Sequence, residues 1–570
     1  MIISKKWLTS ILAASLLFGF AGCKKDAPKS QDEVTQKVQA LADGKWDKAE
    51  VNALLAFVPE DTPFVFASTR EFDLNHPAFK KVFEKSKVVM EQLNNLMQKS
   101  MPKTDEEGAK IANKMMSDLK ALISDYANVA KDYGMNPEHN DSIIYMDGSL
   151  VVAKITADDG AKFQAKIEEY TKMLPDLSIT EVKAGTDSFI EYGIKDSSEE
   201  KYAAYINYGK NIITIVLNAD ANNTAELART LKVADKQLLK SKLGKVSSDV
   251  AALGYVNNEA IVDKIFASGI LKEEEELAEL FTPECNAEIK AIVADYPRLN
   301  MVYRIKNDSE FSSDLSLVIN NKDALKRLES LHAESIKITN DKTMLSMGIN
   351  IDFGKAITWF KETATSISSK QYACAPLKAA ATEIGKLPGL LLLPQAAQFI
   401  AIAEGISGIS FALDNFSYTE IENNKFDSIQ ALVDVSGPTI GKSLPSALAL
   451  AAAVSPEIAT IRPNAEEATT IDLAKLDVGN LSIQAYMSDT DFLIGTKNYD
   501  IKTIAKSPRK ANPNFLELSL NTSFYNMLLE DQNDDDLVAF KQILDALNFS
   551  YTWTIGTDSE GLSGSVIVKF

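Results

Sequence analysis

Residues 202–217 read YAAYINYGKNIITIVL, and residues 481–496 read LSIQAYMSDTDFLIGT. Each stretch contains two runs of apolar, β-branched and aromatic residues separated by a short polar turn. This pattern is typical of a β-hairpin, in which two antiparallel strands are joined by a tight turn. The two stretches start at residues 202 and 481, so they are offset by 279 residues.

A second pattern recurs around these hairpins, and it consists of a short strand, an Asn or Asp turn and a helix. Its four copies begin near Phe64, Val250, Met344 and Phe515. The first and third copies lie about 280 residues apart, and the second and fourth about 265 apart. Because these offsets resemble that of the hairpins, they predict two homologous halves, 46–310 and 311–570. Chance recurrence of a common motif is the alternative.

The spacing of apolar residues predicts the other elements. Alternation predicts strands at 149–155, 177–182, 188–194 and 561–570, and helices are expected at 159–173, 224–231 and 322–333. Three- and four-residue spacing predicts two long helices, 77–100 and 106–133, with Gly134 as the C-terminal cap of the second. We therefore expect an α+β fold with two related lobes, each an antiparallel sheet with helices packed on one face, plus a long N-terminal helical hairpin.

The amino terminus carries an export signal. Lys5 and Lys6 precede an apolar run, residues 7–20, which is shorter than the roughly twenty residues that span a bilayer. The run ends in Phe20-Ala21-Gly22-Cys23, which resembles the bacterial lipobox, in which the cysteine is lipidated before cleavage. We expect residues 1–22 to be a lipoprotein signal peptide, Cys23 to carry the lipid, including palmitate, and polar residues 23–45 to form a tether. An ordinary signal peptide with a chance cysteine is the alternative.

The residue after Cys23 is Lys24 rather than Asp. In lipoproteins of the enteric type, Asp at this position retains the protein at the inner membrane. By this resemblance we expect the chain to be anchored in the cell envelope at the outer membrane, facing the periplasm. The opening Pro59-Glu-Asp-Thr-Pro63 and the lipobox together resemble large bacterial envelope lipoproteins of uncharacterised function. The resemblance implies no activity, so it assigns no catalytic residue.

Length and charge limit the classes of partner. At 570 residues the chain is too long for one compact core, so at least two domains are expected. The formal net charge of −19 argues against nucleic acid as a partner, because phosphates require clusters of Lys and Arg.

Cys285 and Cys374 are the cysteines that remain after Cys23. An even pair in an exported protein predicts a disulfide that would close a loop of about ninety residues. Two separate buried thiols are the alternative.

Motifs that suggest chemistry are each incomplete. Residues 436–443, SGPTIGKS, resemble a phosphate-binding loop, but Ser436 stands where the motif needs Gly. Residues 405–409 lack the last Gly of a nucleophile elbow, and none of His76, His139 and His332 has a persuasive catalytic partner. The acidic run 531–536 lacks the Gly of a calcium loop. We therefore predict no enzyme activity, catalytic residue, metal site or cofactor.

Two Leu- and Ala-rich segments, 387–402 and 444–454, remain unexplained. They are ordinary core helices or the walls of a groove for an acyl chain. The sequence predicts a lipid-anchored, non-enzymatic binding or scaffolding module with an envelope protein as its partner. The alternative is a carrier or chaperone for lipids or other apolar ligands in the periplasm.

Overall fold

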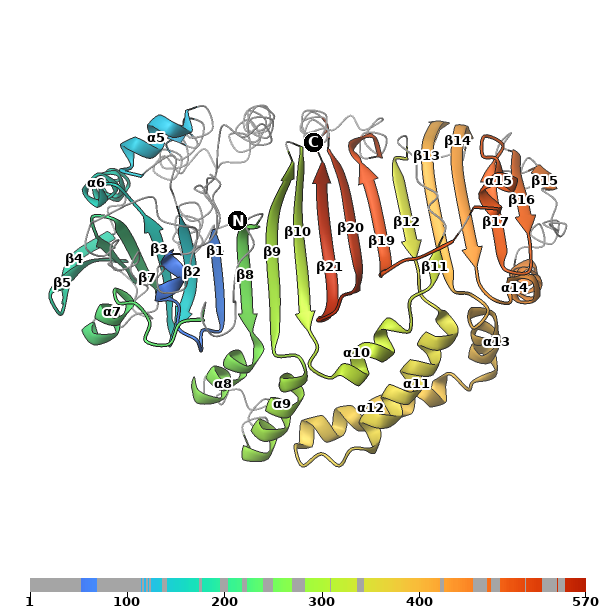
Figure 1. The fold of residues 1–570 in the computed structure, drawn as a ribbon, viewed down its shortest axis with the longest axis horizontal. Coiled ribbons are helices and arrows are strands. Elements are labelled where there is room, and N and C mark those ends of the chain that lie inside the picture. Colours follow the sequence, from blue (N-terminus) through green and yellow to red (C-terminus); the bar gives the residue numbers. More distant parts are fainter. Residues whose placement is uncertain are drawn as a thin grey trace. The chain divides into compact units, whose positions relative to one another are not determined.

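The computed structural model describes residues 53–68, 125–135, 141–173, 177–194, 203–217, 223–238, 250–268, 282–307, 309–335, 343–420, 425–454, 469–472, 482–507, 509–524 and 549–569, with isolated residues 114, 117, 118, 121 and 541. The chain divides into two compact units. The described part of unit 1 lies within 53–261 and 298–313, and that of unit 2 within 262–297 and 314–569. Each unit is described by itself below (Figure 1).

Nine strands in the described part of unit 1 pair in one consistent order. They are β1 (Phe64–Ser68), β2 (Ser142–Asp147), β3 (Leu150–Thr156), β4 (Leu177–Ala184), β5 (Asp187–Ile194), β6 (Ala203–Tyr208), β7 (Ile212–Leu217), β8 (Val250–Asn257) and β9 (Arg298–Asn307). All pairs are antiparallel, in the order β4-β5-β6-β7-β3-β2-β1-β8-β9.

Helices pack on both faces of the unit 1 strands. The 3-10 helix η1 (Ala53–Phe57) and α7 (Thr224–Thr230) contribute to one core cluster, in which Leu54, Tyr145 and Leu227 are buried. Helices α5 (Tyr126–Asp132) and α6 (Gly160–Thr171) contribute Ala130 and Phe163 to the other cluster. The alternation of strand side chains explains this arrangement, because successive residues point to opposite faces and both faces here are apolar.

Unit 2 repeats this order of pairing. Its strands are β12 (Leu345–Ile349), β13 (Gly408–Glu420), β14 (Lys425–Ser436), β15 (Thr469–Asp472), β16 (Ser482–Met487), β17 (Asp491–Thr496), β19 (Asn514–Asn521), β20 (Ser550–Thr557) and β21 (Gly561–Lys569). They pair in the order β21-β20-β19-β12-β13-β14-β17-β16-β15. If β12 is placed on β1, then β13, β14, β17 and β19 fall on β2, β3, β7 and β8. Descent of the two halves from one duplicated segment stays a prediction.

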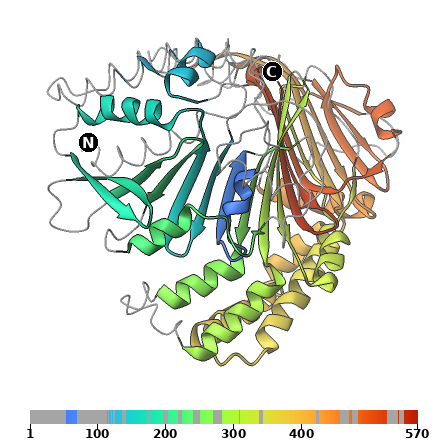
Figure 2. The same ribbon diagram turned by 60° about the vertical axis from the view of Figure 1, so that its left-hand side comes forward.

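The remaining elements of the described chain connect these strands. They are α8 (Asn258–Ser268), α9 (Pro283–Asp295), β10 (Glu310–Val318), α10 (Lys322–Glu329), β11 (Glu334–Ser335), α11 (Phe353–Ser369), α12 (Ala375–Leu390), α13 (Pro394–Ala403), α14 (Ile440–Val454), α15 (Ile501–Ala505) and β18 (Lys510–Ala511). Figures 1 and 2 show α11 and α12 alongside one another, beyond the ends of the unit 2 strands rather than across the sheet.

Local sequence signals place several helix ends. The side chains of Asp159, Asn321 and Asp352 accept hydrogen bonds from backbone N–H groups in the first turns of α6, α10 and α11. Gly134 adopts a φ of 69° just after α5, as a C-terminal cap requires. The predicted hairpins at 202–217 and 481–496 are confirmed as β6–β7 and β16–β17.

The expected fold class is wrong in its arrangement. Nineteen strands of the described chain belong to a single antiparallel sheet, rather than to two lobes with a sheet each. The spacing of apolar residues predicts where strands lie but not which strands pair, so it could not distinguish one sheet from two. Helices also pack on both faces in unit 1, not on one. The predicted long N-terminal helical hairpin lies outside the described residues, apart from α5 and isolated positions.

The division of the chain also differs from the expected halves. Residues 262–297 belong to unit 2, although they precede β9, which belongs to unit 1. A disulfide between Cys285 on α9 and Cys374 explains this assignment, because it joins α9 to the start of α12. A smaller correction concerns His332, which was expected on a helix over 322–333. Helix α10 ends at Glu329, and His332 forms a β-bridge with Ile351.

We expect Gly437→Ala to lower the free energy of unfolding by about 1–3 kcal/mol. An added Cβ would lie 1.9 Å from the carbonyl oxygen of Gly405, so the two backbone segments would have to separate. The matched control is Gly389→Ala, because nothing lies within 4 Å of a Cβ at that position. Urea unfolding measures both changes. Equal midpoints for the two variants would contradict the close approach.

Candidate functional site

One face of the unit 2 sheet is apolar across five neighbouring strands. Met347 on β12 stands opposite Phe411 on β13 and Leu518 on β19, and the row continues through Trp553 to Val566. Residues directly opposite one another in an antiparallel pair lie on the same face. Two parallel rows extend this surface, which we call the apolar face: Leu413, Leu345, Leu520, Tyr551 and Val568, and Ile409, Ile349, Leu516, Ile555 and Gly564.

The opposite face of the same strands, which we call the polar face, carries small and polar residues, with Ile567 as an apolar exception. Ser410, Gly348, Glu517, Thr554 and Ser565 form one row across it. The hydroxyl groups of Ser519 and Thr552 lie 2.8 Å apart, and Ser565 donates a hydrogen bond to Asp314 at 2.7 Å. The sheet is therefore amphipathic, with one side suited to apolar contacts and the other to polar ones.

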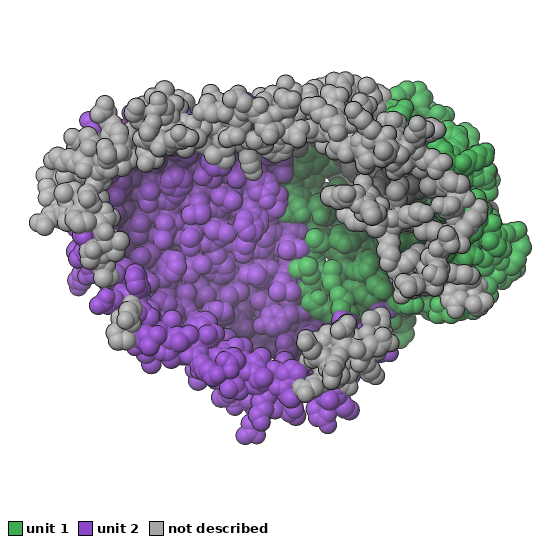
Figure 3. Space-filling view, turned by 180° about the vertical axis from the view of Figure 1, so that it is seen from behind, with its two compact units in different colours: residues 1–261, 298–313, 570 green, residues 262–297, 314–569 purple. Residues whose placement is uncertain are grey.

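The apolar face is only partly covered. Helix α14 packs on it at one end, where Ile440 and Leu444 contact a cluster containing Val435, Phe492 and Ile494. None of the core clusters in the described part of the chain includes a residue from β12, β19, β20 or β21. The side chain of Met347 is 38% exposed, and the other residues of the three rows on β19, β20 and β21 are half-buried. Unit 2 is visibly hollowed on one side (Figure 3).

A buried ionic cluster lies on the polar face beside this surface. Arg509 contacts both Asp434 on β14, at 3.3 Å, and Asp491 on β17. Asp491 also accepts hydrogen bonds from Ser488 and Thr490. Burial raises the pKa of Asp434, and Arg509 opposes that rise. These contacts satisfy both carboxylates, so the cluster fixes the chain around Arg509 to the sheet rather than offering a catalytic pair.

Unit 1 contains a buried lysine that sequence reasoning missed. Lys154 on β3 is 1% exposed, and its ammonium group donates to Thr214 on β7 at 3.0 Å. The Nζ atom also lies 4.3 Å from the ring centroid of Phe57. Burial lowers the pKa of Lys154 to about 7. Since the group is enclosed by the core, it has no access to a substrate despite its perturbed pKa.

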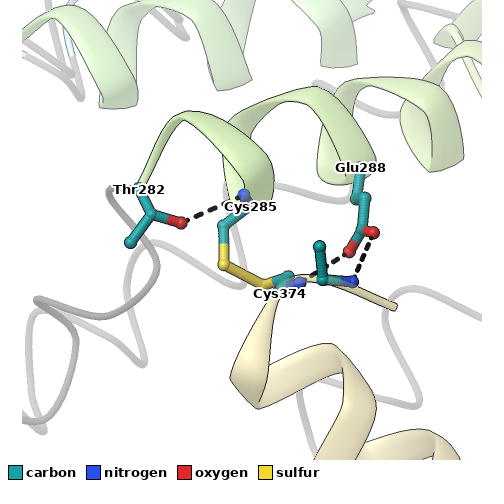
Figure 4. Close-up of a disulfide and its surroundings, with 5 residues drawn as sticks. Thr282, Cys285, Glu288 and Cys374 are labelled. Atoms are coloured by element: carbon teal, nitrogen blue, oxygen red, sulfur yellow. Dashed lines mark hydrogen bonds between the residues drawn. A yellow bond between two sulfur atoms is a disulfide. The ribbon is translucent and has the colours of Figure 1, made fainter. Parts of the chain in front are cut away.

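The pair Cys285 and Cys374 is joined by a disulfide (Figure 4). Cys285 lies in the first turn of α9, where its N–H donates to the hydroxyl of Thr282. Glu288, one turn further along α9, accepts hydrogen bonds from the N–H groups of Ala373 and Cys374 at 2.7 and 3.0 Å. The positive end of the α12 dipole also stabilises a carboxylate at this position. Covalent and polar contacts thus hold α9 against the start of α12.

The two Leu- and Ala-rich segments have different surroundings. Residues 444–454 lie in α14, whose Leu444 packs against the sheet, so part of this segment is a core helix. Residues 387–399 end α12 and begin α13, and they contain five exposed large apolar side chains. The interpretation of the two segments as the walls of one acyl groove stays a prediction.

The incomplete motifs have structural roles. In the loop 436–443, the N–H of Gly437 donates to the carbonyl of Thr490 and that of Gly441 to Asp489. A phosphate-binding loop needs such N–H groups free to face the phosphate. His332 stacks on Phe515 with ring centroids 4.1 Å apart, and its Nε2 atom is hydrogen-bonded to the hydroxyl of Thr557. Burial lowers the pKa of His332. His76, His139 and the acidic run 531–536 lie outside the described residues.

The other predicted sites also lie partly inside and partly outside the described residues. Cys23, the signal peptide and the tether lie outside the described residues. Within the part that is described, no helix has both the length and the apolar character needed to cross a bilayer. No group of metal-ligating side chains gathers among those residues either.

Sequence reasoning missed the partners of Lys154, Arg509 and Glu288, because they become visible only when strands and helices are placed together. A lysine inside an otherwise apolar strand was the one signal available for Lys154.

Comparison with known proteins adds little to this description. No protein family profile matches the chain, and no curated protein matches it. Among solved structures, it is similar to one described as "Structure of crystal form IV of TP0453", at 10% identity and a TM-score of 0.24. That alignment covers 50% of this chain and 88% of the other. A similarity of this size carries no argument about fold or function.

We expect Lys154→Met to flatten the pH dependence of stability between pH 7 and pH 10. The pKa of about 7 in the folded chain lies below the value of about 10.4 expected after unfolding. Between these values the unfolded chain binds the extra proton, so the free energy of unfolding rises with pH by up to about 1.4 kcal/mol per pH unit. The stability gained at high pH is therefore lost as the pH falls from about 10 to 7, and below pH 7 both the folded and the unfolded chain bind the proton.

Urea unfolding at pH 7, 8 and 9 measures the slope. The variant should be less pH-dependent than the wild-type chain and relatively more stable at pH 7, because no ammonium group needs to be buried. The matched control is Lys183→Met, since Lys183 is exposed on β4. A slope unchanged by Lys154→Met would show that Lys154 is not the titrating group.

Proposed function

We propose that the chain is a lipid-anchored, non-enzymatic binding protein of the cell envelope, and that its ligand is an apolar molecule held on the apolar face. The observation that carries this proposal is the half-exposed apolar face of β13, β12, β19, β20 and β21. Monomeric proteins rarely expose contiguous apolar patches of this kind without a function. The proposal assigns no catalytic residue, metal or cofactor.

The composition of the apolar face favours a lipid-like ligand over a protein partner. Its three rows contain no charged side chain, and their only polar groups are the hydroxyl of Tyr551 and the indole N–H of Trp553. Neighbouring strands lie about 4.8 Å apart, so five strands offer an apolar path of roughly 19 Å. Protein interfaces surround an apolar centre with polar groups, whereas an acyl chain needs only continuous apolar contact.

The anchor at Cys23 supports a role at a membrane. Lys24 and the polar residues that follow separate the proposed lipid from the folded units. A protein tethered at the outer membrane and facing the periplasm would meet lipids at high local concentration. An envelope protein partner remains the second candidate, and the half-buried hydroxyl groups of Ser519 and Thr552 on the polar face are the observation that favours it.

We expect Cys23→Ala to abolish acylation of the chain. The lipid needs the thiol of Cys23, and acyl chains make anchoring stable, whereas a signal peptide cleaved elsewhere would leave a chain without lipid. The measurement is incorporation of an alkyne-tagged palmitate in cells, followed by fractionation of membranes. The expected result is label on the wild-type chain and none on the variant. If the wild-type chain carries no label and associates with membranes as the variant does, lipidation at Cys23 is excluded.

We expect the chain from Lys24 onward to bind brominated fatty acid, which quenches indole fluorescence on contact. Trp553 lies in the central row of the apolar face, so a variant carrying Trp46→Phe and Trp359→Phe reports on that surface alone. Introducing Met347→Glu into this double variant should weaken binding at least about tenfold, because the substitution places a charge next to the acyl chain. Native mass spectrometry of the wild-type chain would identify lipid bound during expression.

The matched control is Ser563→Glu, which adds the same charge on the opposite face of β21. It should leave quenching and affinity unchanged. Loss of binding in both variants would indicate a general effect on folding, which circular dichroism would reveal. No quenching of Trp553 at any ligand concentration would reject the apolar face as the binding surface.

A further inference from the structure

The turn between α12 and α13 exposes an unusual concentration of large apolar side chains. Leu392 is 75% exposed, which is the highest value among such residues in the described chain. Four others lie within thirteen residues of one another along this turn: Leu387, Leu390, Leu393 and Phe399, at 38, 55, 51 and 66%. A single exposed leucine is ordinary, but a cluster of five marks a contact surface.

The same segment lacks charge. Residues 387–403, LPGLLLLPQAAQFIAIA, contain no Asp, Glu, Lys or Arg, although the whole chain carries 139 such residues (60 basic and 79 acidic). Lys386 stands immediately before the run and Glu404 immediately after it. Charged residues at both ends of an uncharged apolar segment suit a surface where apolar and aqueous phases meet.

The backbone of the turn satisfies much of its own hydrogen bonding. The N–H groups of Leu392 and Leu393 donate to the carbonyls of Gly389 and Leu390, at 3.1 and 3.3 Å. Pro394 follows, and it has no N–H to satisfy. The N–H of Ala397 bonds to Leu393 as α13 begins. A segment that enters hydrocarbon needs this property, because lipid offers no hydrogen-bonding partner.

We propose that the turn formed by residues 387–399 inserts into the apolar region of a lipid bilayer. Helix α13 has ten residues, or about 15 Å, so the segment enters one leaflet and does not span. The net charge of −19 means that insertion depends on apolar contact rather than on anionic headgroups. The insertion orients the protein at a membrane surface, which is a function separate from ligand binding on the apolar face.

The disulfide gives the turn a rigid support. Cys374 lies at the start of α12, and Leu390 ends that helix, so the covalent link to α9 holds the base of the helix that presents the turn. Helix α11 also packs along α12. A rigid support lowers the conformational entropy that the turn loses on insertion, in the same way that preorganisation favours other binding events.

The test uses the chain from Lys24 onward, which has no acyl chains, and vesicles of phosphatidylcholine with or without phosphatidylglycerol. We expect it to float with both kinds of vesicle to a similar extent. The double variant Leu392→Asp/Leu393→Asp should reduce the vesicle-bound fraction at least about tenfold. The matched control is Ile179→Asp, because Ile179 on β4 is 53% exposed and lies in unit 1.

A second measurement separates insertion from a loss of folding. In Leu392→Trp, the introduced indole should shift its emission to the blue on vesicles and be quenched by brominated lipid. Unchanged emission, or no flotation of the wild-type chain, would overturn the proposal. If the aspartate variant instead abolishes a dimer seen by sedimentation velocity, the turn binds a second copy, and the bilayer is not its target. Met347→Glu should bind vesicles normally, so the two proposals fail independently.

Discussion

The antiparallel ladder of backbone hydrogen bonds is the interaction on which the rest of this structure depends. In unit 2, the five strands that carry the apolar face contribute no residue to a core cluster of the described chain. Among the described residues, no helix shares a core cluster with these strands. Pairing on both sides satisfies the polar groups of each inner strand, and the rows of matched side chains add contacts across the strands.

This dependence on the ladder explains why the apolar face stays half-exposed. Where helices pack against strands, as α5, α6, η1 and α7 do in unit 1, apolar side chains become fully buried. Unit 2 has its long helices α11 and α12 packed on each other instead. Its apolar rows consequently stay half-exposed, and an acyl chain would supply the missing contacts. Burial of these rows by a ligand would follow the same apolar driving force as burial in a core.

Ionic and covalent contacts fix the parts that the ladder leaves unsupported. Arg509 neutralises two buried carboxylates and thereby holds the segment that leads into β19. Glu288 and the disulfide hold α9 to α12, and α12 in turn presents the exposed leucine turn. Apart from the contact between Arg509 and Asp491, these contacts join residues that are 75 to 89 positions apart in the sequence. They place two surfaces, the apolar face and the turn 387–399, on the same unit without contributing chemistry of their own.

The sequence by itself determined the local elements, because alternation and three- to four-residue spacing are properties of neighbouring residues. The hairpins, the cap at Gly134 and most strand positions in unit 1 could be read in this way. The assignment of Cys23 as a lipidation site also rests on local sequence alone.

Only the tertiary structure decided which strands pair, and it replaced two separate sheets with one. Strand pairing is nonlocal, so the rows that unite Met347, Leu518 and Trp553 could not be recognised from the sequence. The exposure of Leu392 was equally hidden, since a leucine-rich segment reads the same whether it lies in a core or on a surface. Burial and exposure depend on what other segments cover, and that information belongs to the folded chain.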